Sequence, residues 1–186
     1  NLFDMAYFDI ETTGFDKEND QIILISIGHF CNKDIFVITQ YFSEAPEDEV
    51  HILYELNKKI KNYKVWCTYN GGAFDIPFIK KKMSDNNIKF NSQKKHNDLY
   101  RMIRPFYRSL GMERCNLKSV ERRIGIQRQD KIDGGISVKL YDKYMQSRDE
   151  KIRDIIMLHN YEDVLNLPKI YKLVYEIDED DSIRRD

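Results

Sequence analysis

The sequence predicts a single α/β domain in which helices flank a central mixed sheet of five or six strands. Two patterns predict this class. Three strand-like runs follow one another directly near the start of the chain, and later strand-like runs alternate with helical ones. The chain has 186 residues, 41% of them hydrophobic, which is enough for one sizeable core. Because no repeat or linker interrupts the sequence, we expect one domain over residues 1–186.

The first part of the chain predicts three antiparallel strands, a helix and a fourth strand. MAYFDI, QIILISIGHF and DIFVITQYF are rich in strand-forming residues, and CNKD joins the last two as a short hairpin loop. Apolar residues then recur at helical spacing, before the strand-like run KVWCTYN. The expected strands are residues 5–10, 21–30, 34–42 and 64–70, and the expected helix is 47–62.

The second part of the chain predicts mainly helices. Gly71 and Gly72 turn the chain into AFDIPFIKKKM, a helix that tolerates Pro77 in its first turn. Two helices, DLYRMIRPFYRSL and NLKSVERRIG, are expected to stop at Gly111 and Gly125. We expect loops at 84–97 and 127–135, a long helix from about Asp149 to Tyr175, and a frayed acidic tail at 176–186.

Charge is distributed unevenly along the chain, although the formal net charge is only −1. Residues 1–78 hold 6 basic and 13 acidic side chains, residues 79–131 hold 15 and 5, and residues 132–186 hold 9 and 13. A basic middle between acidic ends is typical of a phosphate-backbone footprint beside a metal site. A solvated, lysine-rich surface explains the same pattern, and charge alone favours the two interpretations equally.

Cysteine usage and hydropathy predict a cytoplasmic protein. Cys31, Cys67 and Cys115 are scattered and odd in number, which argues against a disulfide framework or a zinc site and favours a reducing compartment. The longest apolar run, IILISI, is too short to span a membrane, and no signal peptide opens the chain. Because the chain begins with asparagine, we expect an excised domain or a processed chain.

Two carboxylates stand side by side at the end of the first expected strand. Asp9 and Glu11 in FDIETTG are two residues apart, so on a strand their side chains point to the same face. Like charges in this arrangement destabilise a sheet, and a bound cation would offset their repulsion. A solvent-exposed strand end is the alternative, but the apolar flank MAYF favours the metal interpretation.

Two further segments supply matching side chains. Asp75 follows a strand and a Gly-Gly turn in YNGGAFD, and His159 and Asp163 are four residues apart on one helix face that also carries Ile152 and Ile156. Carboxylates are hard oxygen ligands that suit Mg²⁺ or Mn²⁺. Two such ions can activate a water and stabilise a leaving oxygen, while a histidine can take the proton. The residues therefore predict metal-assisted phosphodiester hydrolysis.

Taken together, FDIETTG, YNGGAFD and HNYED resemble the three motifs of the DEDD-type 3′-5′ exonucleases of the ribonuclease H-like superfamily. More narrowly, the chain is similar to the bacterial YprB-like ribonuclease H-like domain, because NLKSVERRIGIQR followed by DKIDG, at residues 116–134, resembles a segment typical of that group. The resemblance covers about residues 5–175. It implies the ribonuclease H-like fold, with three antiparallel strands and then parallel strands.

The resemblance also implies a role for each acid. Asp9 would bridge two divalent cations, Mg²⁺ or Mn²⁺, and Glu11 and Asp163 would bind the cation that activates water. Asp75 would hold the second cation through water, and His159 would orient or deprotonate the nucleophile. The histidine stands three residues before Asp163, which is the spacing of the tyrosine-type motif. Since one residue turns a helix by about 100°, Asp163 is the firmer expectation.

On the substrate side, the resemblance implies that Thr12 contacts the terminal nucleotide through its backbone and that Asn70 and Phe74 line the same pocket. Asp98 is expected either near the site or as a helix N-cap. Aromatic residues among arginines could stack on bases, although their helical spacing favours core packing. These residues are Tyr100, Phe106 and Tyr107 among Arg101, Arg104 and Arg108.

The function that the sequence favours is a metal-dependent 3′-5′ exonuclease acting on single-stranded DNA or RNA, with the basic segment 79–131 on the backbone. One alternative is a nucleic-acid-binding module with weak or no catalysis that serves a larger assembly. Another is an unrelated α/β domain whose acids lie on the surface. No residue pattern reads a 2′-hydroxyl, so DNA and RNA stay open.

Overall fold

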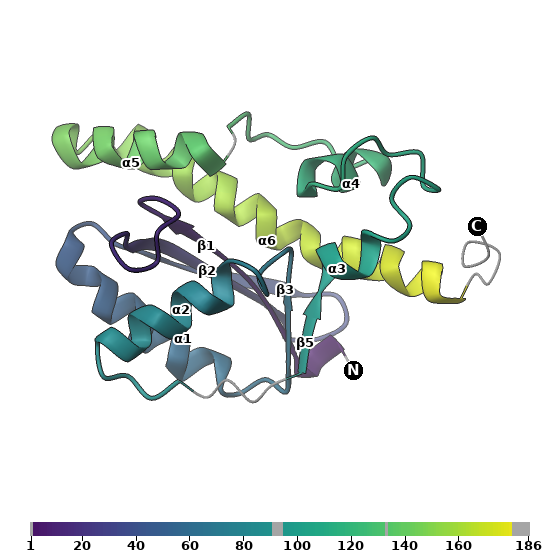
Figure 1. Ribbon diagram of the computed structural model, residues 1–186, viewed down its shortest axis with the longest axis horizontal. Helices are drawn as coiled ribbons and strands as arrows, with labels where there is room; N and C mark the ends of the chain where they lie inside the picture. The colour runs from purple at the N-terminus through teal and green to yellow at the C-terminus, as the bar shows by residue number, and fades with distance from the viewer. Residues whose placement is uncertain (1, 91–94, 133, 180–186) are drawn as a thin grey trace.

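The computed structural model describes residues 2–90, 95–132 and 134–179, and within them the chain forms one mixed sheet with helices on both faces (Figure 1). The sheet has five strands in the order β3-β2-β1-β4-β5. β1 pairs antiparallel with β2, and β2 with β3, while β1 and β4, and β4 and β5, are parallel. The strands are β1 Met5–Thr12, β2 Ile22–Phe30, β3 Phe36–Phe42, β4 Val65–Thr68 and β5 Lys95–Asp98.

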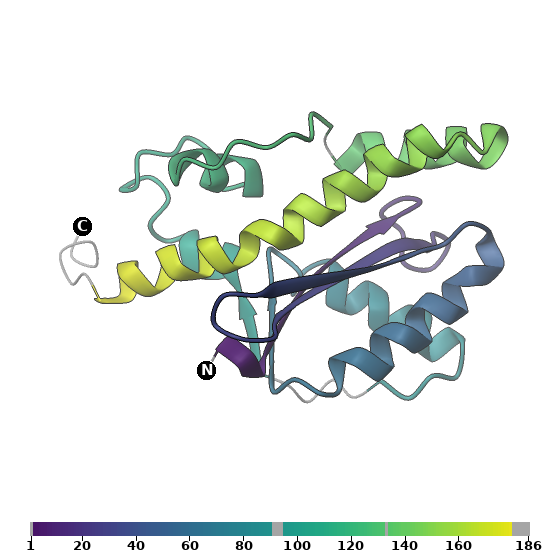
Figure 2. The same ribbon diagram turned by 180° about the vertical axis from the view of Figure 1, so that it is seen from behind.

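The helices form two layers. In both views α1 and α2 lie on one face of the sheet, and α6 crosses the other face (Figures 1 and 2). α3 and α4 lie on the same side of the sheet as α6. The longer helices are α1 Glu49–Ile60, α2 Asp75–Asp85, α5 Gly134–Ser147 and α6 Glu150–Glu179, and the shorter ones are α3 Leu99–Ile103, α4 Leu117–Arg123 and the 3-10 turns Leu2–Asp4 and Pro46–Asp48.

Four local predictions differ from the structure. The helix expected over DLYRMIRPFYRSL forms only as α3, which ends at Ile103, and turns follow it to Gly111. Residues 84–97 were expected as a loop, but β5 begins at Lys95, where the polar sequence KHND has none of the apolar alternation that marks a strand. The helix α5 follows the expected loop without having been predicted, because it opens on two glycines. α6 continues past the predicted end at Tyr175 to Glu179, and the remainder of the expected tail lies outside the described residues.

Side chains of strand β1 point alternately into two hydrophobic clusters, one on each face of the sheet. Ala6, Phe8 and Ile10 belong to the hydrophobic cluster that α1 and α2 cover. Met5 and Tyr7 belong to the cluster that contains Val164, Leu167 and Ile170 of α6. Because side chains alternate along a strand, the next two odd-numbered residues, Asp9 and Glu11, continue the row that faces α6. No helix in the described parts of the chain combines the length and apolarity that a bilayer crossing requires.

α6 packs closely against the sheet at Gly28 of β2. A Cβ atom at this position would lie 2.3 Å from Cζ of Phe36 and 2.9 Å from Cγ1 of Val164, far inside van der Waals contact. Val164 directly follows Asp163, so the absence of a side chain at Gly28 lets α6 settle at the depth at which Asp163 reaches the row of acids on β1.

We therefore expect Gly28→Ala to destabilise the protein by about 1–3 kcal/mol, because the added methyl group forces α6 and Phe36 away from the sheet. Urea denaturation followed by circular dichroism measures the change. Gly135→Ala in α5 is the matched control, since nothing lies within 4 Å of its Cβ position, and it should be neutral or stabilising by up to about 1 kcal/mol. Equal stability of the two variants would contradict the close approach of α6.

Candidate active site

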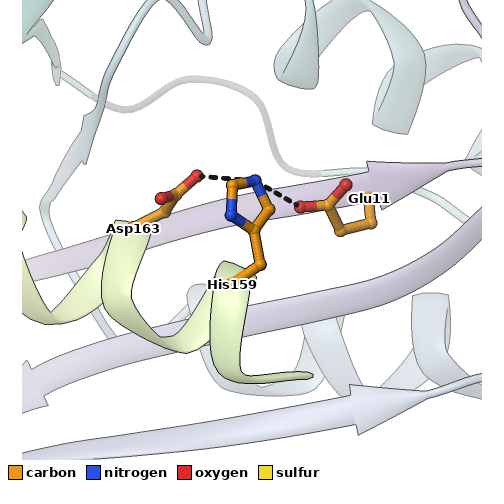
Figure 3. A group of neighbouring side chains, drawn as sticks. All are labelled: Glu11, His159 and Asp163. Carbon is orange, nitrogen blue, oxygen red and sulfur yellow. Dashed lines mark ion pairs between the residues drawn. The ribbon is translucent and has the colours of Figure 1, made fainter. Parts of the chain in front are cut away.

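Three predicted side chains meet where α6 crosses the end of β1. Figure 3 shows Glu11 from β1 facing His159 and Asp163, which project from successive turns of α6. Nε2 of His159 lies 3.7 Å from Oε1 of Glu11 and 3.8 Å from Oδ2 of Asp163. One potential ligand atom from each of the three residues lies within 4.8 Å of the others, which suits a bound metal ion.

Asp9 is held beside this group by a chain of hydrogen bonds that crosses the sheet. Nδ2 of Asn160 donates to Oδ2 of Asp9 at 2.7 Å. Oγ of Ser26 donates to Oδ1 of Asn160, and Nε2 of Gln40 donates to Oγ of Ser26 at 2.9 Å. This orientation leaves the second oxygen of Asp9 for another ligand. Sequence reasoning missed Asn160, although it directly follows His159 in the motif HNYED.

Asp75 reaches the site from the opposite layer, as the first residue of α2. β1 pairs with β4 only over residues 5–7, so the backbone of β1 beyond Tyr7 is open on that side. Oδ1 of Asp75 accepts a hydrogen bond from the Ile10 N–H at 3.2 Å. The side chain is 4% exposed, and its charge contributes to the raised pKa values of both Asp9 and Glu11.

The acids raise one another's pKa values. Removal from water raises the pKa of Asp9 well above its usual range, and the charges of Asp75 and Asp163 raise it further. Burial raises the pKa of Glu11, with the charge of Asp163 as the next cause. Burial also raises the pKa of Asp163, although His159 and Arg128 oppose the shift. A divalent cation among these groups would offset the cost of ionising them.

Asp130 orients the histidine. Oδ2 of Asp130 lies 2.8 Å from Nδ1 of His159. Burial raises the pKa of Asp130, but the hydrogen bond with His159 and the backbone N–H of Ile132 outweigh it and hold the pKa below its usual range. An ionised Asp130 accepts a hydrogen bond from Nδ1–H of His159, so in the neutral ring the other nitrogen, Nε2, presents its lone pair to Glu11 and Asp163. The structure thus turns His159 toward the acids despite its tyrosine-type spacing.

Arg128 is the cation that the surrounding acids share, and Nζ of Lys118 also lies 3.4 Å from Oδ2 of Asp130. The side chain of Arg128 is only 7% exposed, and its contacts join the segment after α4 to α6. Nη2 also donates to the backbone oxygen of His159 at 2.9 Å. Glu162 of α6 also binds the segment after α4, because its carboxylate accepts hydrogen bonds from the backbone N–H groups of Gln129 and Asp130. The guanidinium contacts four carboxylates: Glu121 at 3.1 Å, Asp130 at 3.0 Å, Glu162 at 3.6 Å and Asp163 at 2.5 Å.

A cleft of about 280 Å³ opens above the acids. Phe74 and Phe15 form one wall, with their ring centroids 6.0 Å apart, and Phe15 is 79% exposed at the mouth. Sequence reasoning missed Phe15, although it directly follows the first motif. The predicted residues that line the cleft are Asp9, Glu11, Thr12, Phe74, His159 and Asp163, and the unpredicted ones include Phe15, Asn116, Leu117, Lys118 and Val138.

Neither Asn70 nor Asp98 lines the cleft, but the charge of Asp98 lies near enough to Asp75 to raise its pKa. Asn70 lines a second cavity, beside Tyr100, Arg101 and Arg104. Asp98 makes no side-chain cap to α3. Its carboxylate instead accepts from the N–H groups of Asn70 and Gly72, at 2.9 and 3.0 Å. Asn70 adopts φ 63°, so this carboxylate stabilises the unusual turn that leads into Asp75.

The raised pKa of Asp75 predicts how stability depends on pH without metal. Burial raises this pKa to about 7, whereas the unfolded value is about 4. The folded protein therefore binds more protons in this interval, and its free energy of unfolding falls as pH rises from about 4 to about 7. In EDTA, Asp75→Asn should become progressively more stable than wild type across this range, because asparagine keeps the oxygen that Ile10 N–H contacts.

Urea denaturation of both proteins at several pH values measures this difference. Mg²⁺ or Mn²⁺ at neutral pH should stabilise wild type more than the variant, since the cation compensates the ionised carboxylate. Parallel stability curves for the two proteins would contradict the assignment of a raised pKa to Asp75.

Replacement of Arg128 should be severely destabilising. Arg128→Met leaves four carboxylates without their shared cation, and removal of one partner from a buried ion pair costs about 3–5 kcal/mol. Arg122→Met is the matched control, because Arg122 is exposed on α4 and should change stability by at most about 0.5 kcal/mol. Thermal and urea unfolding in EDTA compare the two. If Arg128→Met were as stable as the control, Arg128 would not be the balancing charge.

Comparison with known proteins bears on the fold and the family. A family model described as the RNase_H superfamily matches residues 6–175. The chain is 29% identical over 175 residues to the uncharacterized protein YprB of Bacillus subtilis (strain 168), a match that covers 92% of this chain and 41% of that protein. The chain therefore spans less than half the length of this relative.

Two solved structures share the architecture. One is the family B DNA polymerase from the hyperthermophilic archaeon Pyrobaculum calidifontis, with a TM-score of 0.73 and 15% identity over 93% of this chain and 24% of the polymerase. The other is the zinc-bound form of the E. coli ExoI–ssDNA complex, with a TM-score of 0.56 and 12% identity over 81% of this chain and 42% of ExoI. The family model and these folds confirm the expected ribonuclease H-like architecture. The protein belongs to the RNase_H superfamily.

Proposed function

We propose that the protein is a metal-dependent nuclease that removes nucleotides from the 3′ end of single-stranded DNA or RNA. The observation that carries the proposal is the meeting of Glu11, His159 and Asp163 within 4.8 Å in a cleft that Asp9 also lines. Asp75 does not line the cleft, but it is buried close enough to raise the pKa values of Asp9 and Glu11. Acids this close are costly to ionise unless a cation joins them. Their oxygen-rich donor set fits Mg²⁺ or Mn²⁺.

Each of the chain's own groups has a part in this proposal. Asp9, Glu11, Asp163 and Asp75 would hold two divalent cations, which supply an activated water and stabilise the leaving oxygen. His159 faces the acids with Nε2 and would accept the proton of the attacking water, while Asp130 keeps Nδ1 protonated. These roles match the acid and base chemistry of phosphodiester hydrolysis.

The walls of the cleft suit one terminal nucleotide. Phe74 and Phe15 offer aromatic surface on which a base can stack, and stacking of this kind is sequence-tolerant. Thr12 lines the cleft next to Glu11, where its backbone would contact the terminal nucleotide, and Asn70 would contact the substrate from the second cavity. The likeness to ExoI, which was solved with single-stranded DNA, supports a single-stranded substrate.

One observation favours a second candidate, a nucleic-acid-binding module with weak or no catalysis. Arg128 lies 2.5 Å from Oδ1 of Asp163 and so supplies an internal positive charge to an acid that we assign to a metal. If the guanidinium kept this place when nucleic acid is bound, the site would hold cations weakly. Salt-sensitive binding without turnover in Mg²⁺ or Mn²⁺ would identify such a module.

The proposal predicts that Asp163→Ala lowers turnover by at least about a hundredfold, because removing a metal ligand costs more than removing a residue that only supports one. The assay uses 5′-labelled single-stranded DNA and RNA of one sequence with Mn²⁺, Mg²⁺ or EDTA. Wild type should produce a metal-dependent ladder that shortens from the 3′ end.

Asp154→Ala is the matched control, since Asp154 is an exposed acid on the same helix, and it should keep wild-type activity. Near-wild-type turnover by Asp163→Ala would refute the metal assignment. Absence of cleavage by folded wild-type protein would favour the binding module instead.

A further inference from the structure

Another polar hollow, of about 550 Å³, lies beside α4 and is distinct from the second cavity near Asn70. It is formed by the turn before α4 and by the helix itself, and we call it the arginine hollow. Its guanidinium groups come from Arg114, Arg122 and Arg123, and its other polar side chains are Asn116, Ser119 and Glu113. All three arginines are exposed, so the hollow presents positive charge to solvent.

The arginines of the hollow have no carboxylate partner at ion-pair distance among the described residues. Arg123 is anchored through Nε, which donates to the Leu110 carbonyl oxygen at 2.6 Å. Nη2 of Arg122 donates to Oγ of Ser119 at 3.4 Å. These contacts use one donor of Arg122 and one of Arg123 and leave their other donors for a ligand. Arg128, a few residues further on, differs because four acids already surround it.

The hollow and the cleft share a wall at Asn116. Asn116 lines both spaces, and its side chain accepts from the N–H of Ser119 at 2.9 Å, which fixes it at the start of α4. A chain that leaves the cleft over Asn116 can therefore enter the arginine hollow. A third hollow also borders Asn116, but it contains the carboxylates of Glu121 and Asp130 beside its cations.

The second cavity is less suited to an anion. Arg101 there lies 3.7 Å from Oδ2 of Asp98, and Arg104 lies over the Tyr100 ring at 5.7 Å. Its two positive charges are thus partly satisfied within the protein. The arginine hollow has three guanidinium groups against the single carboxylate of Glu113.

We propose that the arginine hollow binds a backbone phosphate of the nucleic-acid strand whose 3′ end lies in the cleft, an inference that rests on the proposed function. Guanidinium groups bind phosphate oxygens through paired hydrogen bonds, and phosphate contacts position a strand without reading its sequence. The protein accordingly prefers a strand that extends past its terminal nucleotide, and a substrate too short to reach the hollow gains nothing from it.

The test compares the double variant Arg114→Gln/Arg122→Gln with wild type on two substrates. One is a 5′-labelled single strand of about ten nucleotides, long enough to span both spaces. The other is the p-nitrophenyl ester of thymidine 5′-monophosphate, which reaches only the cleft. The double variant should raise KM for the strand about tenfold with kcat unchanged, and it should hydrolyse the ester at the wild-type rate.

Binding provides a readout that needs no turnover. Fluorescence anisotropy of the labelled strand in EDTA, at several salt concentrations, should show weaker binding by the double variant. The salt dependence of log K should flatten by about 0.7 for each lost phosphate contact. If wild type cleaved neither substrate, the proposed function would fail, yet the anisotropy would still decide whether the hollow binds a strand.

Two controls keep the inference open to refutation. Lys64→Gln removes a charge just before β4, at the opposite end of the parallel strands from the acids, and should leave affinity and salt dependence unchanged. Arg104→Gln probes the second cavity. The inference is overturned if Arg104→Gln weakens binding while the double variant does not. The inference is also overturned if the double variant loses activity equally on the strand and on the ester, since the arginines would then affect the cleft itself.

Discussion

The packing of α6 across the face of β1 is the contact on which the candidate site depends. Met5 and Tyr7 bury their side chains against α6, and the same alternation carries Asp9 and Glu11 beneath it. Gly28 permits the close approach that brings Asp163 down to this row. The apolar contacts along α6 therefore provide the free energy that holds like charges together, and the site sits at the end of the core where that row becomes acidic.

Charge balance is the second requirement, and the segment between α4 and α5 meets it. Arg128 brings one cation among four carboxylates, and Glu162 ties the loop to α6 through two backbone N–H groups. The same loop supplies Asp130, which turns the free nitrogen of His159 toward the acids. The loop between α4 and α5 thus orients two side chains of α6. Asp130 orients His159, and Arg128 orients Asp163.

Two neighbouring spaces near the acids suit different parts of a nucleic acid. The cleft combines aromatic rings with carboxylates and suits a nucleotide unit and its metals, whereas the neighbouring hollow presents arginines whose charges are not balanced internally. Asn116 lies between them. Four acids from the two acidic ends of the sequence, Asp9, Glu11, Asp75 and Asp163, come together at the sheet. Four cations of the basic middle, Arg114, Lys118, Arg122 and Arg123, lie on α4 or on the turn before it.

Local patterns in the sequence determined the class of the fold and the core of the candidate site. The two-residue spacing of Asp9 and Glu11 and the four-residue spacing of His159 and Asp163 each place a pair on one face of its element, and those faces meet as expected. Only the tertiary structure decided which groups surround them. Arg128 contacts residues more than thirty positions away, and Asn70, whose backbone N–H donates to the carboxylate of Asp98, lines another cavity. Short polar β5 and glycine-led α5 are likewise held by neighbours in the fold. The periodicity of apolar residues in the sequence indicates which face of a helix or strand a residue occupies. The contacts between residues distant in the chain depend on how the helices and strands pack together.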